Sequence, residues 1–168
     1  AKEDNISILP KYLPKLVSIP IKANNNSFSI ENFFSISSIK ILLFLYILII
    51  KNVESKFEVE KELLLALMGI ETNFGKYLGK MDIVSSLATL SFDKRRSEFF
   101  TEELLILLRL VDKNIIDKNI LYGSWAGAFG NFQFMPRTIR NYAVDYNLNK
   151  TIELKKIEAS FASAANYV

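Results

Sequence analysis

The segment that decides the fold is residues 63–75, which have the sequence LLLALMGIETNFG. Its first six residues are apolar, and three glutamates lie near the start of the helix that this segment predicts over residues 58–70. Carboxylates there are stabilised by the positive end of the helix dipole. Gly75 then allows a tight turn. We therefore expect a helix whose C-terminal end presents Glu71.

Apolar periodicity predicts helices along most of the remaining chain. Apolar residues recur at three- and four-residue steps after Ser97, and Pro136 suits the first turn of a helix. The expected helices cover residues 29–52, 83–90, 97–111, 136–144 and 157–167. No sustained alternation of apolar and polar residues predicts a large sheet. The expected class is therefore all-α, or α with a minor hairpin.

Prolines and glycines divide the chain into two regions. Three of the four prolines lie in the first twenty residues, whereas all six glycines lie between Gly69 and Gly130. Because these residues interrupt regular structure in different ways, we expect an irregular leader over residues 1–28 and one helical domain over residues 29–168. A chain of 168 residues fits a single domain.

Residues 41–50, ILLFLYILII, form an unbroken apolar run. A membrane-spanning helix needs about 17–25 apolar residues, so ten are too few. Extending the run back to Phe33 adds length but includes serines and Lys40. We expect a helix buried in the core of a soluble domain, and the alternative is a membrane anchor over residues 33–50.

Composition excludes several kinds of chemistry. The chain has no cysteine and no histidine, which removes disulfides, thiol nucleophiles, Ser-His-Asp triads and zinc sites built on thiolate or imidazole. The net charge is +3, from 21 basic and 18 acidic residues that are spread along the chain. This is not the concentrated basic surface that nucleic-acid binding needs, so we expect no nucleic-acid partner.

Two segments carry groups suited to chemistry. Glu71 follows an apolar helix, and partial desolvation there would favour the protonated carboxyl that a general acid needs; the alternative is a helix-end glutamate in water. Residues 123–136, GSWAGAFGNFQFMP, combine small hydroxyl and amide groups with large aromatics. This composition suits an uncharged polyol ligand, although it also suits a buried loop whose aromatics are core.

A third segment, residues 145–151, places oxygen side chains at alternate positions, as a calcium loop does. It has Lys150 where the sharp-turn glycine is needed, and Lys156 where a bidentate glutamate is needed. We therefore expect an ordinary polar loop and no metal site.

Five stretches together resemble the membrane-bound lytic murein transglycosylase B family. They are residues 69–75, 87–100, 123–136, 142–145 and 165–167, in the order and spacing of that family from about residue 52 onward. The resemblance implies a lysozyme-like helical domain that needs no cofactor. It also implies cleavage of the β-1,4 bond between N-acetylmuramic acid and N-acetylglucosamine in peptidoglycan, with formation of a 1,6-anhydro end.

The resemblance assigns the single catalytic carboxylate to Glu71, as general acid and then base. It assigns glycan contacts to Ser124 and Gln133, and a saccharide-binding wall to Phe134 and Met135.

Further assignments concern the edges of the cleft. The family's arginine pair falls on Arg95 and Arg96, where guanidinium groups would meet substrate carboxylates. On the residues alone, this basic cluster would be a solvated turn. Asn166 and Tyr167 match a further cleft-lining pair.

The resemblance also implies partners and a location. The expected partners are peptidoglycan glycan strands and, in addition, other cell-wall enzymes. The residues carry no signal peptide or lipobox, so the expected periplasmic or cell-envelope location comes from the resemblance alone. Relatives continue past the position of Val168, so we expect a catalytic domain incomplete at its C-terminus. The alternative function is a non-catalytic peptidoglycan-binding module.

Overall fold

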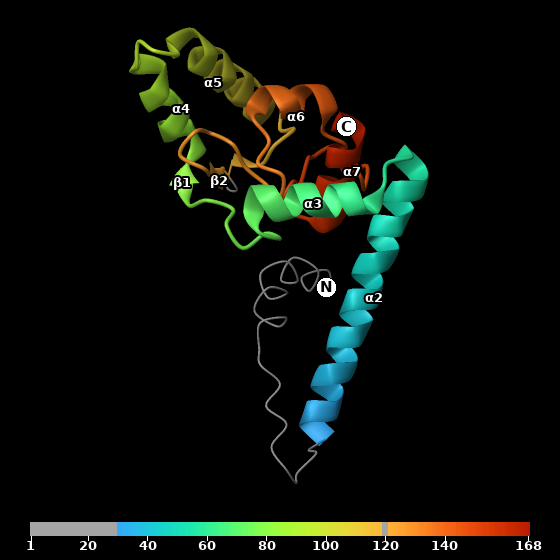
Figure 1. The fold of residues 1–168 in the computed structure, drawn as a ribbon. Coiled ribbons are helices and arrows are strands. Elements are labelled where there is room, and N and C mark those ends of the chain that lie inside the picture. The colour runs from blue at the N-terminus through green and yellow to red at the C-terminus, as the bar shows by residue number, and fades with distance from the viewer. Residues whose placement is uncertain (1–29, 119–120) are drawn as a thin grey trace.

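The computed structural model describes residues 30–118 and 121–168, and within them the side chains of residue 41 and of residues 43 onward. The expected leader over residues 1–28 lies outside the described residues. Helices dominate, which confirms the predicted class (Figure 1). The helices are α2 (Ile30–Phe57), α3 (Lys61–Thr72), α4 (Ile83–Phe92), α5 (Ser97–Asp112), α6 (Pro136–Tyr142) and α7 (Ile157–Tyr167).

A very small antiparallel sheet joins two distant parts of the chain. Strand β1 (Met81–Asp82) pairs with β2 (Tyr122–Gly123), and helices α4 and α5 lie between them in sequence. The predicted minor hairpin is thus a pairing of segments about forty residues apart. The two segments approach each other closely here: a Cβ atom on Gly79 would lie 2.0 Å from the carbonyl oxygen of Gly123. Only glycine fits at position 79.

The corner between α2 and α3 differs from the prediction. Helix α2 continues to Phe57, past the expected end at residue 52, and α3 begins at Lys61 rather than at residue 58. Glu58 has a φ of 57°, in the left-handed region, which ends the first helix. The Lys61 ammonium lies 3.1 Å from Glu54 Oε1 and its backbone N–H donates to the same oxygen, so this ion pair bridges the corner.

Helix α2 projects from the rest of the molecule (Figure 1). Ile50 and Val53 are buried where its C-terminal part packs on α7, whereas Ile41, Phe44 and Ile47 are exposed. The expected burial of the whole apolar run is therefore wrong: one face near the C-terminal end is covered. Within the described residues, no helix combines the length and apolarity needed to cross a membrane.

Helix α7 lies at the centre of the fold. It begins and ends where the sequence predicts, and residues 159–165 are all buried. Most of these residues are alanine or serine, whose small side chains let neighbouring elements approach closely. Helices α2, α3 and α6 all pack on α7, while α4 and α5 pair with each other and α6 joins them.

A buried carboxylate fastens α6 to α5. Glu103 is 1 % exposed. One of its oxygens accepts a hydrogen bond from the backbone N–H of Arg137 at 2.8 Å, and the other lies 3.3 Å from Arg137 Nε. The neighbouring Glu102 also pairs with Arg137, but its side chain is 63 % exposed. The same arginine therefore has one buried and one solvated carboxylate partner.

We predict that Glu103→Ala lowers the free energy of unfolding by about 1–3 kcal/mol, because it leaves the Arg137 N–H and guanidinium without their buried partner. Glu102→Ala, the matched control, should change it by less than about 0.5 kcal/mol, since exposed ion pairs contribute little. Urea denaturation of both variants measures the difference. Equal losses would contradict the role assigned to Glu103.

We also predict a pH-dependent helix cap at the start of α4. The Ser85 N–H donates to Asp82 Oδ1 at 2.7 Å, and this hydrogen bond lowers the pKa of Asp82 below its ordinary value of 3.8. Because the folded-state pKa is depressed, the stabilisation is fully present above the ordinary pKa of 3.8. It is lost as the pH falls through the lower, folded-state pKa. Asp82→Ala should destabilise by about 1 kcal/mol at neutral pH, and this difference should shrink in acid.

Asp82→Asn is the control, since its amide oxygen accepts the same hydrogen bond without titrating. Thermal unfolding between neutral and acid pH should show that the Tm of Asp82→Asn exceeds that of Asp82→Ala by the same amount at every pH. If the wild-type advantage over Asp82→Ala persisted unchanged in strong acid, the carboxylate would not be the cap.

Candidate active site

Glu71 lies in the last turn of α3, and its side chain is exposed. The buried face of this helix consists of Leu64, Met68 and Thr72, which recur every four residues. Glu71 stands off that face, so the expected desolvation of its carboxyl group is wrong. No hydrogen bond or ion pair joins the Glu71 carboxylate to any of the described residues.

A tight turn follows Glu71. Asn73, Phe74 and Gly75 have φ values of 48°, 57° and 78°, so three consecutive residues adopt the left-handed region. The N–H of Asn73 donates to the carbonyl of Gly69 at 3.0 Å, and that of Phe74 donates to the carbonyl of Met68 at 3.3 Å. These bonds satisfy carbonyls at the helix end, as in a Schellman-type cap.

Segment 123–136 contains both buried and exposed aromatic residues. Phe129, Phe132 and Phe134 are 7 % exposed or less and belong to the core. Trp125 is 69 % exposed. The core interpretation therefore holds for the three phenylalanines, and the ligand-binding interpretation stays a prediction that Trp125 is exposed enough to allow.

The structure brings the end of α3 and this segment together. Thr72 Oγ1 donates to the carbonyl oxygen of Asn131 at 2.9 Å, and Gln133 Nε2 donates to the carbonyl of Leu78 at 3.3 Å. One bond comes directly after Glu71 and the other closes the turn that follows. The catalytic candidate thus lies on a turn that is bonded to the predicted glycan-contacting segment.

Besides Gln133 and Phe134, two more predicted binding residues lie within segment 123–136. Ser124 Oγ accepts a hydrogen bond from the Ala128 N–H at 3.1 Å and shapes the loop around Trp125. Met135 is half-buried and is the residue before the first turn of α6. Both side chains retain some exposure.

The end of α7 carries the other predicted cleft pair. The Tyr167 ring lies 5.9 Å from that of Phe134 and 5.1 Å from that of Tyr142. Asn166 Nδ2 donates to the Tyr142 carbonyl at 2.9 Å. Phe134 is 7 % exposed and packs against the Tyr167 ring, so it belongs to the core and its predicted contact with the saccharide stays a prediction.

Arg95 and Arg96 lie elsewhere. They occupy the turn between α4 and α5, at the end of that helix pair that points away from α3 (Figure 1). The Arg96 guanidinium lies 4.4 Å from the centre of the Phe99 ring, a cation–π contact. The structure does not bring these two arginines together with Glu71.

Three exposed aromatics near the candidate site were not singled out from the sequence. They are Phe74, Tyr77 and Tyr122. Their positions, within six residues after Glu71 or directly before Gly123, are the signal that could have identified them. Exposed aromatic rings of this size are suited to stacking on a ligand.

The loop over residues 145–151 is held by its own hydrogen bonds. The two carboxylate oxygens of Asp145 accept from the backbone N–H groups of Asn149 and Lys150 at 3.2 and 2.7 Å. The side-chain amides of Asn147 and Asn149 both donate to Glu153 Oε2.

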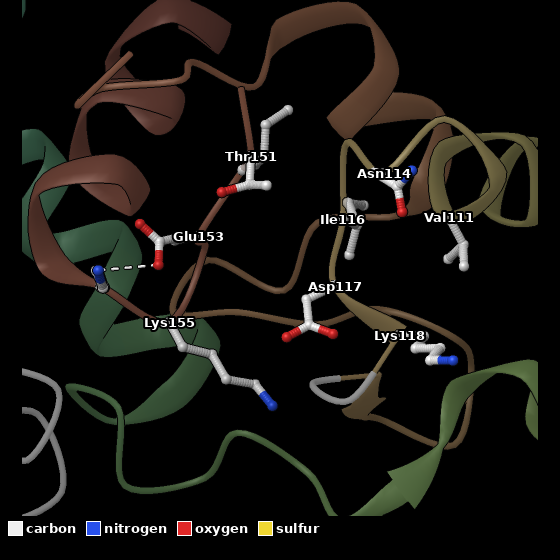
Figure 2. Close-up of a pocket in the computed structure, with 10 residues that line it drawn as sticks. Val111, Asn114, Ile116, Asp117, Lys118, Thr151, Glu153 and Lys155 are labelled. Carbon is white, nitrogen blue, oxygen red and sulfur yellow. Dashed lines mark ion pairs between the residues drawn. The ribbon is translucent and has the colours of Figure 1, made fainter. Parts of the chain in front are cut away.

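A cavity of about 780 Å³ lies beside the end of this loop (Figure 2). It is formed between the loop after α5 and residues 151–156, and none of the predicted site residues lines it. Among its lining residues, Lys156 pairs with Glu153 at 2.9 Å. We assign the candidate site to the Glu71 region, because none of the residues that match the family's motifs lines this cavity.

Comparison with known proteins defines the class. Residues 46–168 match the model of a family described as "Transglycosylase SLT domain", and the chain belongs to this family. The predicted lysozyme-like helical fold of the transglycosylases is thereby confirmed.

Particular relatives are similar over the same region. The chain is 39% identical over 112 residues to "Membrane-bound lytic murein transglycosylase B" of Escherichia coli (strain K12), covering 66% of this chain and 31% of the relative. SltB3 of Pseudomonas aeruginosa, solved in complex with NAG-NAM-pentapeptide, is 33% identical with a TM-score of 0.70, over 74% of this chain and 34% of SltB3.

A third relative is the lytic transglycosylase Slt35 of Escherichia coli, whose structure was solved in complex with calcium. It is 36% identical with a TM-score of 0.68, over 73% of this chain and 40% of Slt35. The chain therefore spans about a third of the length of the relatives that it matches.

Proposed function

We propose that this chain is a lytic transglycosylase, which cleaves the bond between N-acetylmuramic acid and N-acetylglucosamine in peptidoglycan. The observation that carries the proposal is the bonding of the Glu71 turn to segment 123–136, through Thr72 and Gln133. One carboxylate and a set of neutral polar groups with exposed aromatics then lie on adjoining elements. Membership of the transglycosylase family supports the same conclusion.

Glu71 would act twice. As a carboxylic acid it protonates the glycosidic oxygen, so that the C1–O4 bond breaks and the N-acetylglucosamine part leaves. The substrate's own N-acetyl group stabilises the positive charge at C1. The Glu71 carboxylate then takes the proton of the C6 hydroxyl while the oxygen of that hydroxyl bonds to C1, which closes the 1,6-anhydro ring. No second carboxylate and no water molecule are needed, unlike in ordinary glycosidases.

Neutral groups near Glu71 would hold the glycan. The Gln133 amide nitrogen already donates to two backbone carbonyls, so a sugar hydroxyl would bond to its oxygen Oε1. Ser124 Oγ accepts from the Ala128 N–H and would donate its own proton to the sugar. The exposed Trp125 and Tyr77 rings offer apolar faces for the sugar C–H groups.

Two groups of assignments lie outside this centre. Asn166 and Tyr167 would contact the glycan farther along the strand. Arg95 and Arg96 would meet carboxylates of the peptide or lactyl groups only if the substrate extends to the α4–α5 turn. Because the substrate is cell-wall glycan, the chain would act in the periplasm or cell envelope, where other cell-wall enzymes are potential partners.

We predict that Glu71→Gln abolishes the release of anhydro-muropeptides from purified sacculi, because the amide can neither donate nor accept the proton at the scissile bond. The fold should persist, since Glu71 is exposed and unbonded. Mass spectrometry of the digest identifies the reaction, because an anhydro end and a reducing end differ by one water.

Glu98→Gln is a suitable control, as it changes another exposed helical carboxylate away from the site. It should retain wild-type release. Full activity in Glu71→Gln, or products with reducing ends from the wild-type chain, would refute the proposed reaction.

A second candidate function is binding of peptidoglycan without cleavage. The exposure of Glu71 favours it, because no hydrogen bond or ion pair from the described residues holds the carboxylate in one orientation for proton transfer. Co-sedimentation with sacculi separates the two functions. Binding with no released product supports a binding module, whereas binding with anhydro products supports the transglycosylase.

A further inference from the structure

Thr72 directly follows Glu71 and differs from it in burial and in hydrogen bonding. Glu71 is exposed and unbonded, whereas Thr72 is 1 % exposed and lies on the buried face of α3 with Met68. No hydrogen bond or ion pair among the described residues holds the Glu71 carboxylate. The place of its carboxylate therefore depends on the backbone to which Thr72 belongs.

The Thr72 hydroxyl joins three segments. Oγ1 lies 3.1 Å from the carbonyl oxygen of Met68 and 2.9 Å from that of Asn131, and it accepts from the Gly75 N–H at 2.9 Å. A hydroxyl has one proton and two lone pairs, so the two carbonyls share the proton and the N–H bonds to a lone pair. One atom thus connects the last helical turn, the tight turn after it and segment 123–136.

The Asn131 end of this connection is itself fixed. Asn131 is 1 % exposed. Its backbone N–H donates to the Leu154 carbonyl at 3.2 Å, and its side-chain Nδ2 donates to Ser160 Oγ at 3.0 Å. Because its other two bonds lead to residue 154 and to α7, Asn131 is a rigid acceptor against which the end of α3 is held.

We propose that Thr72 is a positioning residue for Glu71: its hydroxyl holds the end of α3 against Asn131 and so sets the separation between the Glu71 carboxylate and the glycan-contacting Ser124 and Gln133. This inference rests on the proposed function of Glu71. A misplacement of about 1 Å can lower a catalytic rate about 100-fold, so such a bond affects turnover without touching substrate.

The test compares Thr72→Val with Thr72→Ser. Valine keeps the shape of threonine and removes its hydrogen bonds, whereas serine keeps the hydroxyl. Thr72→Val should lower kcat for anhydro-muropeptide release about 10- to 100-fold with KM within about twofold. The pH profile should fall in height and keep its midpoints, since Thr72 does not titrate. Thr72→Ser should recover most of the rate.

Ser163→Ala is the matched control. Ser163 is buried in α7, its hydroxyl donates to the carbonyl four residues earlier at 2.6 Å, and it accepts from the Val144 N–H at 3.0 Å. Its loss should lower the Tm as Thr72→Val does and leave kcat unchanged. Should Thr72→Val fail to fold, Thr72→Ala removes the same bonds without adding a methyl group beside Asn131.

Hydrogen exchange of the Gly75 amide provides a readout independent of activity. Its exchange should become faster in Thr72→Val and stay at the wild-type rate in Ser163→Ala. Wild-type kcat in Thr72→Val, an equal loss in Ser163→Ala, or no recovery in Thr72→Ser would overturn the positioning role while Glu71→Gln remained inactive. If the wild-type chain and Glu71→Gln both released nothing, the proposed function would fail, and this inference with it.

Discussion

Segment 123–136 places one constraint on the whole molecule: a buried irregular segment must find a partner for every backbone N–H and carbonyl. Phe129 and Phe134 satisfy each other, with N–H to carbonyl distances of 3.1 and 3.0 Å in both directions. Asn131 takes its partners from outside the segment, from Thr72, the Leu154 carbonyl and Ser160. Helix α3, the segment before α7 and α7 itself are therefore held around it, and the place of Glu71 follows from this packing.

The same segment separates structural from ligand-facing side chains. Its phenylalanines pack inward, where Phe132 makes an edge-to-face contact with Phe161 at 5.2 Å. Trp125 stands outside, in the loop that Ser124 closes. Glu71 and the exposed aromatics lie on turns attached to this core. A rigid buried loop with solvent-facing edges is a suitable support for a glycan, since polysaccharide binding needs fixed polar groups and accessible apolar faces.

The fold was predictable where the signal is local. Helix α7 begins and ends at the predicted residues, and α5 begins at Ser97, because apolar periodicity marks both helices. The end of α2 was missed, since residues 51–57 are compatible with helix and only the left-handed Glu58 ends it. The burial expected for the apolar run failed for a different reason. Hydrophobicity indicates that a side chain favours burial, but the packing on α7 covers Ile50 and Val53 and leaves Phe44 in solvent.

The sequence by itself determined the helical class, the family and the residue types at the site, because these depend on composition, periodicity and motif spacing along the chain. The tertiary structure decided which motif residues face outward and which do not. Phe134 lies in the core and Glu71 is exposed. Arg96 packs on the ring of Phe99, in the turn between α4 and α5. The bond from Thr72 to Asn131 spans 59 positions of sequence. Such a contact follows from how the helices pack together, and no local pattern in the sequence encodes it.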